Sequence, residues 1–376
     1  VPESGLYRMK WEYEQEKNSS PDLLCFGTAD MDYRSPEPVL AALRAVLDRG
    51  HLGYPMIPDR YYEAIHDWLE KTTGWSVDVR CCVSQCAGIY MGASVVLSIL
   101  TNPQDMVTIL TPVHFCYKEI LKLNDRKIIE CPLELTETGY SINFARLEAC
   151  FASGSHLLWL CNPHNPIGHA WTREELERIA RLCLQYQVYI LSDDVYCGLL
   201  FPGAVYTPIA SLSREISRYT VTLYSTSKTY NTAGLRHACM ITENPEIHKR
   251  FQEFLARFDM NYGQNIMGIE ATIAALGEGA TWLQQLMRQM EEAHTFLKNY
   301  VEENLPLCRV IPADSSYFAW IDMRAVKVRP QMLAHLIEQE EHMIVENGYP
   351  LGKEEPVLSG LIWPAVVNIC RKAQNG

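Results

Sequence analysis

Short apolar runs alternate with amphipathic stretches through the middle of the chain. The runs are rich in β-branched and aromatic residues, and we expect strands at 106–110, 127–131, 156–161, 188–191, 219–224 and 238–241. The stretches around them repeat apolar residues at the helical spacing, which predicts helices at 36–49, 60–72, 88–100, 113–123, 172–186 and 245–257. This alternation predicts an α/β fold with a mostly parallel sheet covered by helices on both faces.

The two ends of the chain follow a different pattern. Positions 1–24 are polar and aromatic, whereas a long helical tract, a strand and a further helix are expected at 265–304, 317–323 and 332–341. The length of 376 residues exceeds one ordinary core. We therefore expect a large domain at 50–285 and a smaller, discontinuous α+β domain formed by 1–49 and 286–376.

Net charge and cysteine content narrow the class of protein. The formal net charge of −12 disfavours nucleic acid and anionic membranes as partners. No apolar run approaches the roughly 18 residues that span a bilayer. The 13 cysteines are odd in number and irregularly spaced, which is typical of reduced thiols in the cytoplasm. No second ligand pair completes a tetrahedral site with Cys81, Cys82 and Cys86 or with Cys161 and His164, so we expect no metal.

A lysine follows the predicted strand at 219–224. Binding sites in parallel sheets lie at strand ends, and the amine of Lys228 is a nucleophile suited to a Schiff base. Eight residues later, Arg236 offers a planar fork of donors for a phosphate, and Ser225 and Ser227 add hydroxyls. These groups suit an aldehyde cofactor that carries a phosphate. A solvated loop lysine near an unrelated arginine remains the alternative.

Polar residues follow two further predicted strands. Asp193 could pair with a protonated ring nitrogen of such a cofactor, and Tyr196 could donate to an oxygen on the same ring. A metal site or a helix cap is the alternative for Asp193. The turn 162–168 is rigid because it holds two prolines and a glycine, and Asn165 within it can donate to a ring oxygen. Thr172 and Glu175 predict a capping box at the start of the next helix.

Two weaker signals lie near the other strand ends. His114 follows the strand at 106–110, where its imidazole could lie flat on an aromatic cofactor, although a lone histidine is more often a surface or capping residue. The free N–H groups of Ala87 and Gly88 lie at the start of the helix predicted at 88–100 and could cradle a phosphate. Any helix start has this potential.

Taken together, these motifs resemble a known family. The chain resembles fold-type I pyridoxal-phosphate enzymes of the aminotransferase superfamily in three motifs. They are STSK with an arginine eight residues after the lysine, the DDVY segment, and NPHNPIG. ADMDY at 29–33, Gly53-Tyr54 and YFAWIDMR at 317–324 resemble the cystathionine β-lyase branch. The resemblance covers essentially the whole chain and implies a seven-stranded sheet in the large domain.

The resemblance also implies roles for individual residues. Lys228 would bind pyridoxal 5'-phosphate covalently, Asp193 would meet its pyridine nitrogen, and Asn165 and Tyr196 would hold its ring oxygen. The phosphate would be bound by Ala87, Gly88, Ser225, Ser227 and Arg236. Tyr54 would reach the phosphate and the substrate in a neighbouring subunit, so a homodimer is expected.

Some positions depart from the pattern of the branch. His114 stands where the branch has a stacking Tyr or Phe, and a histidine there is similar to fold-type I decarboxylases. Tyr196 and Arg236 are closer to aminotransferases. Val366 stands where the family has an arginine that grips the substrate carboxylate, and valine cannot form that bidentate pair. Arg371 or another group would have to bind the carboxylate instead.

The resemblance therefore favours a C–S β-lyase that converts cysteine-type conjugates to a thiol, a keto acid and ammonia. In an aminotransferase the same carbanion would be reprotonated on the cofactor. A decarboxylase is a further alternative because of Val366 and His114. Outside enzymology, a cofactor-binding regulatory protein could use the fold for partner contact, although that role alone would not need every cofactor-facing residue.

Overall fold

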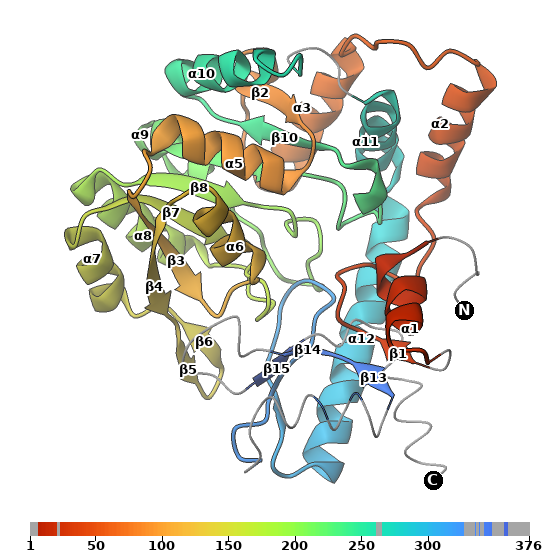
Figure 1. Ribbon diagram of the computed structural model, residues 1–376, viewed down its shortest axis with the longest axis vertical. Helices are drawn as coiled ribbons and strands as arrows, with labels where there is room; N and C mark the ends of the chain where they lie inside the picture. Colours follow the sequence, from red (N-terminus) through yellow and green to blue (C-terminus); the bar gives the residue numbers. More distant parts are fainter. Residues whose placement is uncertain are drawn as a thin grey trace.

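A seven-stranded sheet lies at the centre of the molecule (Figure 1). The computed structural model describes residues 7–20, 23–260, 265–326, 335, 338, 342–347 and 357–359. The strand order is β2 (Val83–Cys86), β10 (Ala238–Ile241), β9 (Thr220–Tyr224), β8 (Tyr189–Asp193), β7 (Ser155–Cys161), β3 (Met106–Thr111) and β4 (Lys127–Pro132). Neighbours are parallel except where β10 pairs with β9 and β2, so the expected α/β fold is confirmed.

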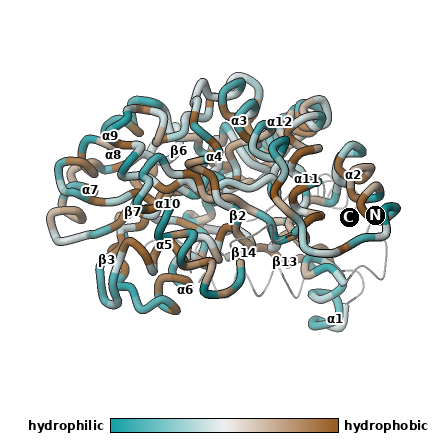
Figure 2. The backbone as a smooth tube through the Cα atoms, turned by 90° about the horizontal axis from the view of Figure 1, so that it is seen from above, coloured by the Kyte–Doolittle hydropathy of each residue, from teal (hydrophilic) through white to brown (hydrophobic). Residues whose placement is uncertain are grey.

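Successive side chains of the central strands enter two different layers of the core. In β7, Leu157 and Trp159 pack into one layer, whereas Leu158 and Leu160 pack into the other, because strand side chains alternate in direction. The first layer is covered by α5 (Ile89–Leu100), α6 (Cys116–Leu123) and α10 (Pro245–Ala256). The second is covered by α7 (Phe144–Ala152), α8 (Arg173–Tyr186) and α9 (Arg214–Tyr219). Figure 2 shows apolar backbone stretches around the sheet and hydrophilic turns at the periphery.

Segments from both ends of the chain lie side by side (Figure 1). Near the N-terminus are η1 (Met9–Tyr13), α1 (Glu14–Lys17) and β1 (Leu24–Cys25), and β1 pairs with β13 (Met343–Ile344). A four-stranded sheet contains β11 (Arg309–Val310), β12 (Trp320–Asp322), β15 (Val357–Ser359) and β14 (Glu346–Asn347). The long helix α12 (Ala280–Asn304) runs beside these elements, as Figure 1 shows. Helix α2 (Glu37–Asp48) packs on α11 (Ile266–Glu278), which packs on α3 (Asp59–Thr73), and the short helix α4 (Val79–Cys82) leads into β2. Among the described helices, none has a stretch long and apolar enough to cross a bilayer.

Most predicted elements are confirmed, but several differ from the expectation. The strand predicted at 219–224 begins at Thr220, because Tyr219 ends α9, a helix that was not predicted. The sequence analysis did not assign β2, whose polar residues Ser84 and Gln85 are buried, nor the hairpin β5 (Glu134–Thr136) and β6 (Gly139–Ser141). The strand expected at 317–323 is shorter, because Tyr317 and Phe318 pack against Tyr196 before β12 begins. The helix expected at 332–341 lies largely outside the described residues.

The turn after β7 is joined to the chain before β12 at Gly168. The Gly168 carbonyl accepts hydrogen bonds from the backbone N–H groups of Asp314 and Ser315, both at 3.0 Å. Its φ of +66° lies in the left-handed region, and an added Cβ would meet the Ser315 carbonyl oxygen and the Ala313 Cβ at 2.8 Å. This position therefore requires glycine on two counts, backbone conformation and space.

We expect Gly168→Ala to lower the thermal unfolding temperature more than Gly203→Ala does. Gly203 has a φ of +93° but nothing within 4 Å of an added Cβ, so its variant incurs only the backbone strain of about 1–2 kcal/mol. Gly168→Ala adds overpacking of roughly 1–3 kcal/mol. Differential scanning calorimetry on both variants measures the difference. Equal losses would show that the contact with residues 313–315 does not constrain the turn.

Candidate active site

A cavity of about 760 Å³ opens where β9, β8, β7 and β3 end. These four strands are neighbours and run in parallel, so their carboxyl ends meet at one edge of the sheet. Because β10 is antiparallel, the residues before it reach the same edge. The cavity is lined by ten of the predicted site residues: Ala87, Gly88, His114, Asn165, Asp193, Tyr196, Ser225, Ser227, Lys228 and Arg236.

Lys228 lies under the N-terminal segment 29–33. Its Nζ donates to the carbonyl oxygen of Ala29 at 2.7 Å, and the Tyr317 hydroxyl donates to the same oxygen at 3.3 Å. The side-chain amide of Asn231 donates to two further carbonyls of this segment, at 3.1 and 2.7 Å. The segment that carries the branch-like ADMDY sequence thus packs directly over the lysine.

A buried ion pair holds that segment in place. The side chain of Lys10 is buried and donates to the Asp30 carbonyl at 2.9 Å and to Asp32 Oδ2 at 2.8 Å. The other Asp32 oxygen accepts from the Trp11 indole at 2.6 Å. Burial raises the pKa of Asp30, although the nearby cations Lys10 and Lys228 oppose the increase. Lys10 lines the cavity, and sequence analysis missed it because its partners lie about twenty residues away.

Asp193 is the buried carboxylate of the cavity. Its Oδ2 accepts from the Tyr117 hydroxyl at 2.7 Å, and its Oδ1 accepts from the backbone N–H of Val195 at 3.3 Å. Burial raises its pKa to about 6, against the opposing effects of these hydrogen bonds and of Lys228. The carboxylate is therefore mainly ionised at neutral pH and is placed to hold a cationic group.

The neighbouring Asp194 has a different environment. It accepts from the Ser192 hydroxyl at 2.5 Å and from the Tyr206 hydroxyl, and it does not line the cavity. Burial raises its pKa to about 7. These contacts give Asp194 a structural role. Among the described residues, no three His, Cys, Asp or Glu side chains are grouped so that they could hold a metal ion.

The two asparagines of the turn after β7 have separate roles. Asn162 donates to the Thr207 carbonyl at 2.9 Å and accepts from the Trp171 N–H at 3.3 Å, so it stabilises the turn. Asn165 lines the cavity, and its amide donates to the Tyr196 hydroxyl at 3.2 Å. The structure thus brings Asn165 and Tyr196 together, as both were predicted to bind one ring oxygen.

The opposite end of the cavity is rich in hydrogen-bond donors. The first turn of α5 lines it, and the first N–H groups of a helix have no partner within the helix. The Gly88 N–H donates to the Cys86 carbonyl at 2.9 Å, so this amide is not free, contrary to the expectation from the sequence. Arg236 is exposed and itself has a left-handed backbone conformation, and its guanidinium forms no hydrogen bond with the described residues. This end can therefore bind an anion.

His114 lies beside two aromatic rings in the cavity. Its ring centroid is 4.5 Å from that of Phe115, and its Nδ1 is 3.1 Å from the Tyr90 hydroxyl. Burial, together with the charge of Lys228, lowers the pKa of His114 to about 4. The imidazole is neutral at pH 7 and can pack against an aromatic ligand.

Three predicted residues are not brought to the cavity by the described chain. Tyr54 is fully exposed, at 102% of its reference area, and does not line the cavity. Val366 and Arg371 lie outside the described residues. The roles predicted for these three residues remain predictions.

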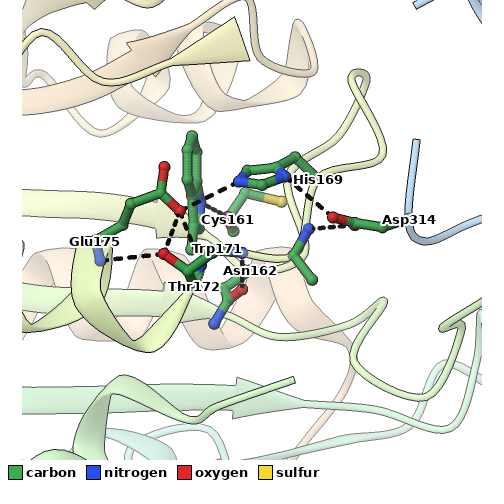
Figure 3. A network of polar contacts seen from close by, with 8 residues as sticks. Cys161, Asn162, His169, Trp171, Thr172, Glu175 and Asp314 are labelled. Carbon is green, nitrogen blue, oxygen red and sulfur yellow. Dashed lines mark hydrogen bonds and ion pairs between the residues drawn. The ribbon is translucent and has the colours of Figure 1, made fainter. Parts of the chain in front are cut away.

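A histidine that the sequence analysis did not single out joins the Asn165 turn to the chain before β12 (Figure 3). His169 Nε2 lies 3.2 Å from Glu175 Oε2, and its Nδ1 lies 3.2 Å from Asp314 Oδ2. Glu175 also forms the predicted capping box with Thr172. Burial alone would lower the pKa of His169, but the hydrogen bonds to Asp314 and Glu175 outweigh it and raise the pKa to about 9.

The chain is similar to known proteins over nearly its full length. The family model for aminotransferase class I and II matches residues 21–358. Cystathionine beta-lyase PatB of Bacillus subtilis (strain 168) is 31% identical over 93% of this chain and 90% of its own length. Protein MalY of Escherichia coli (strain K12) is 26% identical over 94% and 90% of the two chains. The crystal structure of cystalysin from Treponema denticola, which contains pyridoxal 5'-phosphate, has a TM-score of 0.93 at 25% identity and covers 100% of this chain and 95% of its own.

We expect the folded state to lose stability as the pH rises through about 9, because His169 then loses its proton. A raised pKa means that the fold favours the charged imidazole, so the stabilisation is complete below about 6.5 and disappears above about 9. His169→Gln should flatten this part of the stability profile in urea unfolding at pH 6 to 10. His156→Gln, at an exposed position of β7, is the control. A profile unchanged by His169→Gln would contradict the assignment.

Proposed function

The chain belongs to the class I and II aminotransferase family, and from this premise we propose that it is a pyridoxal-phosphate-dependent C–S β-lyase. Its substrates are cysteine-type conjugates, which it converts to a thiol, a keto acid and ammonia. The observation that carries the proposal is the joint presence of Lys228, Asp193, Asn165 and the anion-binding end in one cavity. The match to cystathionine beta-lyase PatB at 31% identity supports the lyase reaction.

The chemistry of the cavity fits the cofactor from end to end. The buried carboxylate of Asp193 suits a protonated pyridine nitrogen, and the Asn165–Tyr196 pair suits the ring oxygen. The first turn of α5, the hydroxyl of Ser227 and Arg236 suit a phosphate dianion. The Ser225 hydroxyl was predicted to join them, but it donates to the His237 carbonyl at 2.6 Å. The amine of Lys228 faces the same space. Cystalysin, which has the same fold, contains this cofactor.

Lys228 is the residue that moves the proton in the proposed reaction. When bound, pyridoxal phosphate withdraws electrons from the bonds of the substrate α-carbon. The amine of Lys228 would accept the α-proton of the substrate as a general base. The carboxylate of Asp193 would stabilise a positive charge on the ring nitrogen of the cofactor. A protonated ring withdraws electrons more strongly than a neutral one. The neutral imidazole of His114 would pack against the ring and would add no charge.

Loss of the α-proton is followed by cleavage of the C–S bond. The electron pair of the α-carbon forms a double bond to the β-carbon, and the sulfur departs with the bonding pair and takes a proton. Addition of water to the resulting unsaturated amine gives the keto acid and ammonia. The net reaction consumes one water and requires no added keto acid, which distinguishes it from transamination.

We propose a homodimer in which Tyr54 completes the neighbouring cavity. The loop between α2 and α3 exposes three large apolar side chains, with Leu52 at 64%, Tyr54 at 102% and Met56 at 86% of their reference areas. Such neighbouring apolar side chains are typical of an interaction surface. Tyr54 does not line the cavity of its own chain, which supports a role in the partner's site.

We expect borohydride reduction of the protein with bound pyridoxal phosphate to attach the cofactor permanently to Lys228. Peptide mass spectrometry should locate the added mass on the peptide that contains this residue. Lys228→Ala should abolish the label, whereas Lys118→Ala should retain it, because Lys118 pairs with Glu130 away from the cavity. A label on a different lysine in the wild type would refute the assignment.

We also expect S-alkyl cysteines and cystathionine to yield pyruvate, thiol and ammonia in equal amounts without an added keto acid. Because Lys228 acts as the general base, Lys228→Ala should lower the rate by roughly 10²–10⁴-fold or more. Coupled assays of pyruvate and of free thiol measure this. Product that forms only with an added keto acid would identify an aminotransferase, and release of carbon dioxide would identify a decarboxylase.

A further inference from the structure

Tyr117 touches the carboxylate that faces the cavity but belongs to none of the site motifs. It lies in α6, one turn after His114, and is 2% exposed. Its hydroxyl donates to Asp193 Oδ2 at 2.7 Å. Its ring stacks on Trp159 of β7, with centroids 4.1 Å apart and an angle of 19° between the planes. The stack fixes the ring, so the hydroxyl is held toward Asp193.

We infer that Tyr117 is a positioning residue that keeps Asp193 ionised and oriented toward the ring nitrogen of the cofactor. This inference rests on the proposed function, because it takes Asp193 as the partner of that nitrogen. It adds that part of the free energy of cofactor binding comes from the Tyr117 hydroxyl on α6. The same hydroxyl also sets part of the pH dependence of binding. Tyr117 does not touch the reacting atoms, so its effect passes through Asp193.

The hydrogen-bond geometry supports this role. One oxygen of Asp193 accepts from Tyr117 and the other from the Val195 N–H, which fixes the plane of the carboxylate. Each oxygen has two lone pairs, so a position remains for a cationic N–H donor. A donor to the ionised form opposes the effect of burial, which by itself favours the protonated acid. Burial, with the charge of Asp193, raises the pKa of Tyr117 well above 10, so the hydroxyl keeps its proton and remains a donor.

The other groups near Asp193 do not replace this donor. Lys228 favours the ionised carboxylate of Asp193 by its charge, whereas the charge of Asp193 itself raises the pKa of Asp194. The titratable groups that interact electrostatically with Asp193 are Tyr90, Tyr117, Cys161, Asp194, Tyr196 and Lys228. Among these, Tyr117 is the one whose side chain donates a hydrogen bond to Asp193.

The test measures cofactor affinity, not turnover. Tyr117→Phe removes the hydroxyl but keeps the ring and its stack on Trp159. We expect the dissociation constant of pyridoxal phosphate, from titration of tryptophan fluorescence without substrate, to rise roughly ten-fold at pH 7.5, because a hydrogen bond to a charged group is lost. Tyr206→Phe is the matched control, since it removes a buried hydroxyl from Asp194, which does not line the cavity. Thermal melting of both variants establishes that they are folded.

The pH dependence separates positioning from a general loss of structure. As the pH falls, protonation of Asp193 weakens binding, and without the Tyr117 hydroxyl this protonation occurs more easily. The fall in affinity should therefore begin about one pH unit higher in Tyr117→Phe than in the wild type. The cofactor phosphate also titrates near pH 6, but it does so equally in both proteins, so the difference between the profiles reports Asp193. Tyr206→Phe should reproduce the wild-type profile.

Asp193→Asn separates failure of this inference from failure of the proposed function. If Asp193→Asn binds the cofactor as tightly as the wild type, Asp193 is not the partner of the ring nitrogen. That part of the proposed function and the role of Tyr117 are then both refuted. If Asp193→Asn weakens binding but Tyr117→Phe leaves affinity and pH profile unchanged, only the role of Tyr117 is refuted. Combining the two substitutions should weaken binding no further than Asp193→Asn alone, since Tyr117 acts through the carboxylate.

Discussion

The direction of four neighbouring strands is the constraint on which the site depends. Because β9, β8, β7 and β3 are parallel, the segments that follow them leave the sheet at one edge, and each brings a different polar group to the same cavity. The amine, the carboxylate, the amide and the imidazole therefore come from segments up to about a hundred residues apart. The one antiparallel strand, β10, adds Arg236 at the same edge because it begins where its neighbours end.

Burial of charge is the second constraint, and the molecule meets it differently at each site. The buried amine of Lys10 pairs with Asp32, which belongs to the segment that covers Lys228. Asp193 and Asp194 are adjacent and both buried, yet each accepts a hydrogen bond from its own tyrosine. Burial favours the protonated acid, and the tyrosine hydroxyls oppose this effect by donating to the carboxylates. The carboxylate that faces the cavity and the other buried charged groups thus follow the same rule, that a buried ionised group needs a hydrogen-bond donor or an opposite charge beside it.

The chain before β12 links the cavity to the small sheet. It is fixed to the turn after β7 by the Gly168 carbonyl and by the interaction of His169 with Asp314. A few residues later, Tyr317 packs against Tyr196 and donates to the carbonyl above Lys228. The position of the segments that line the cavity therefore depends on contacts between parts of the chain more than a hundred residues apart.

The sequence alone determined the class of fold, most of the helices and strands, and ten residues of the cavity, because strand ends and turn residues carry local signals. It did not reveal β2, whose polar residues hide a buried strand, or the hydrogen bond of Gly88. Nor could it show that Tyr117 supports Asp193, that Lys10 pairs with Asp32, or that His169 bridges two acids. Those partners are remote in sequence, and only packing of the elements brings their atoms within hydrogen-bonding distance. The sequence therefore identified the side chains that line the cavity, whereas the tertiary structure decided their protonation and orientation.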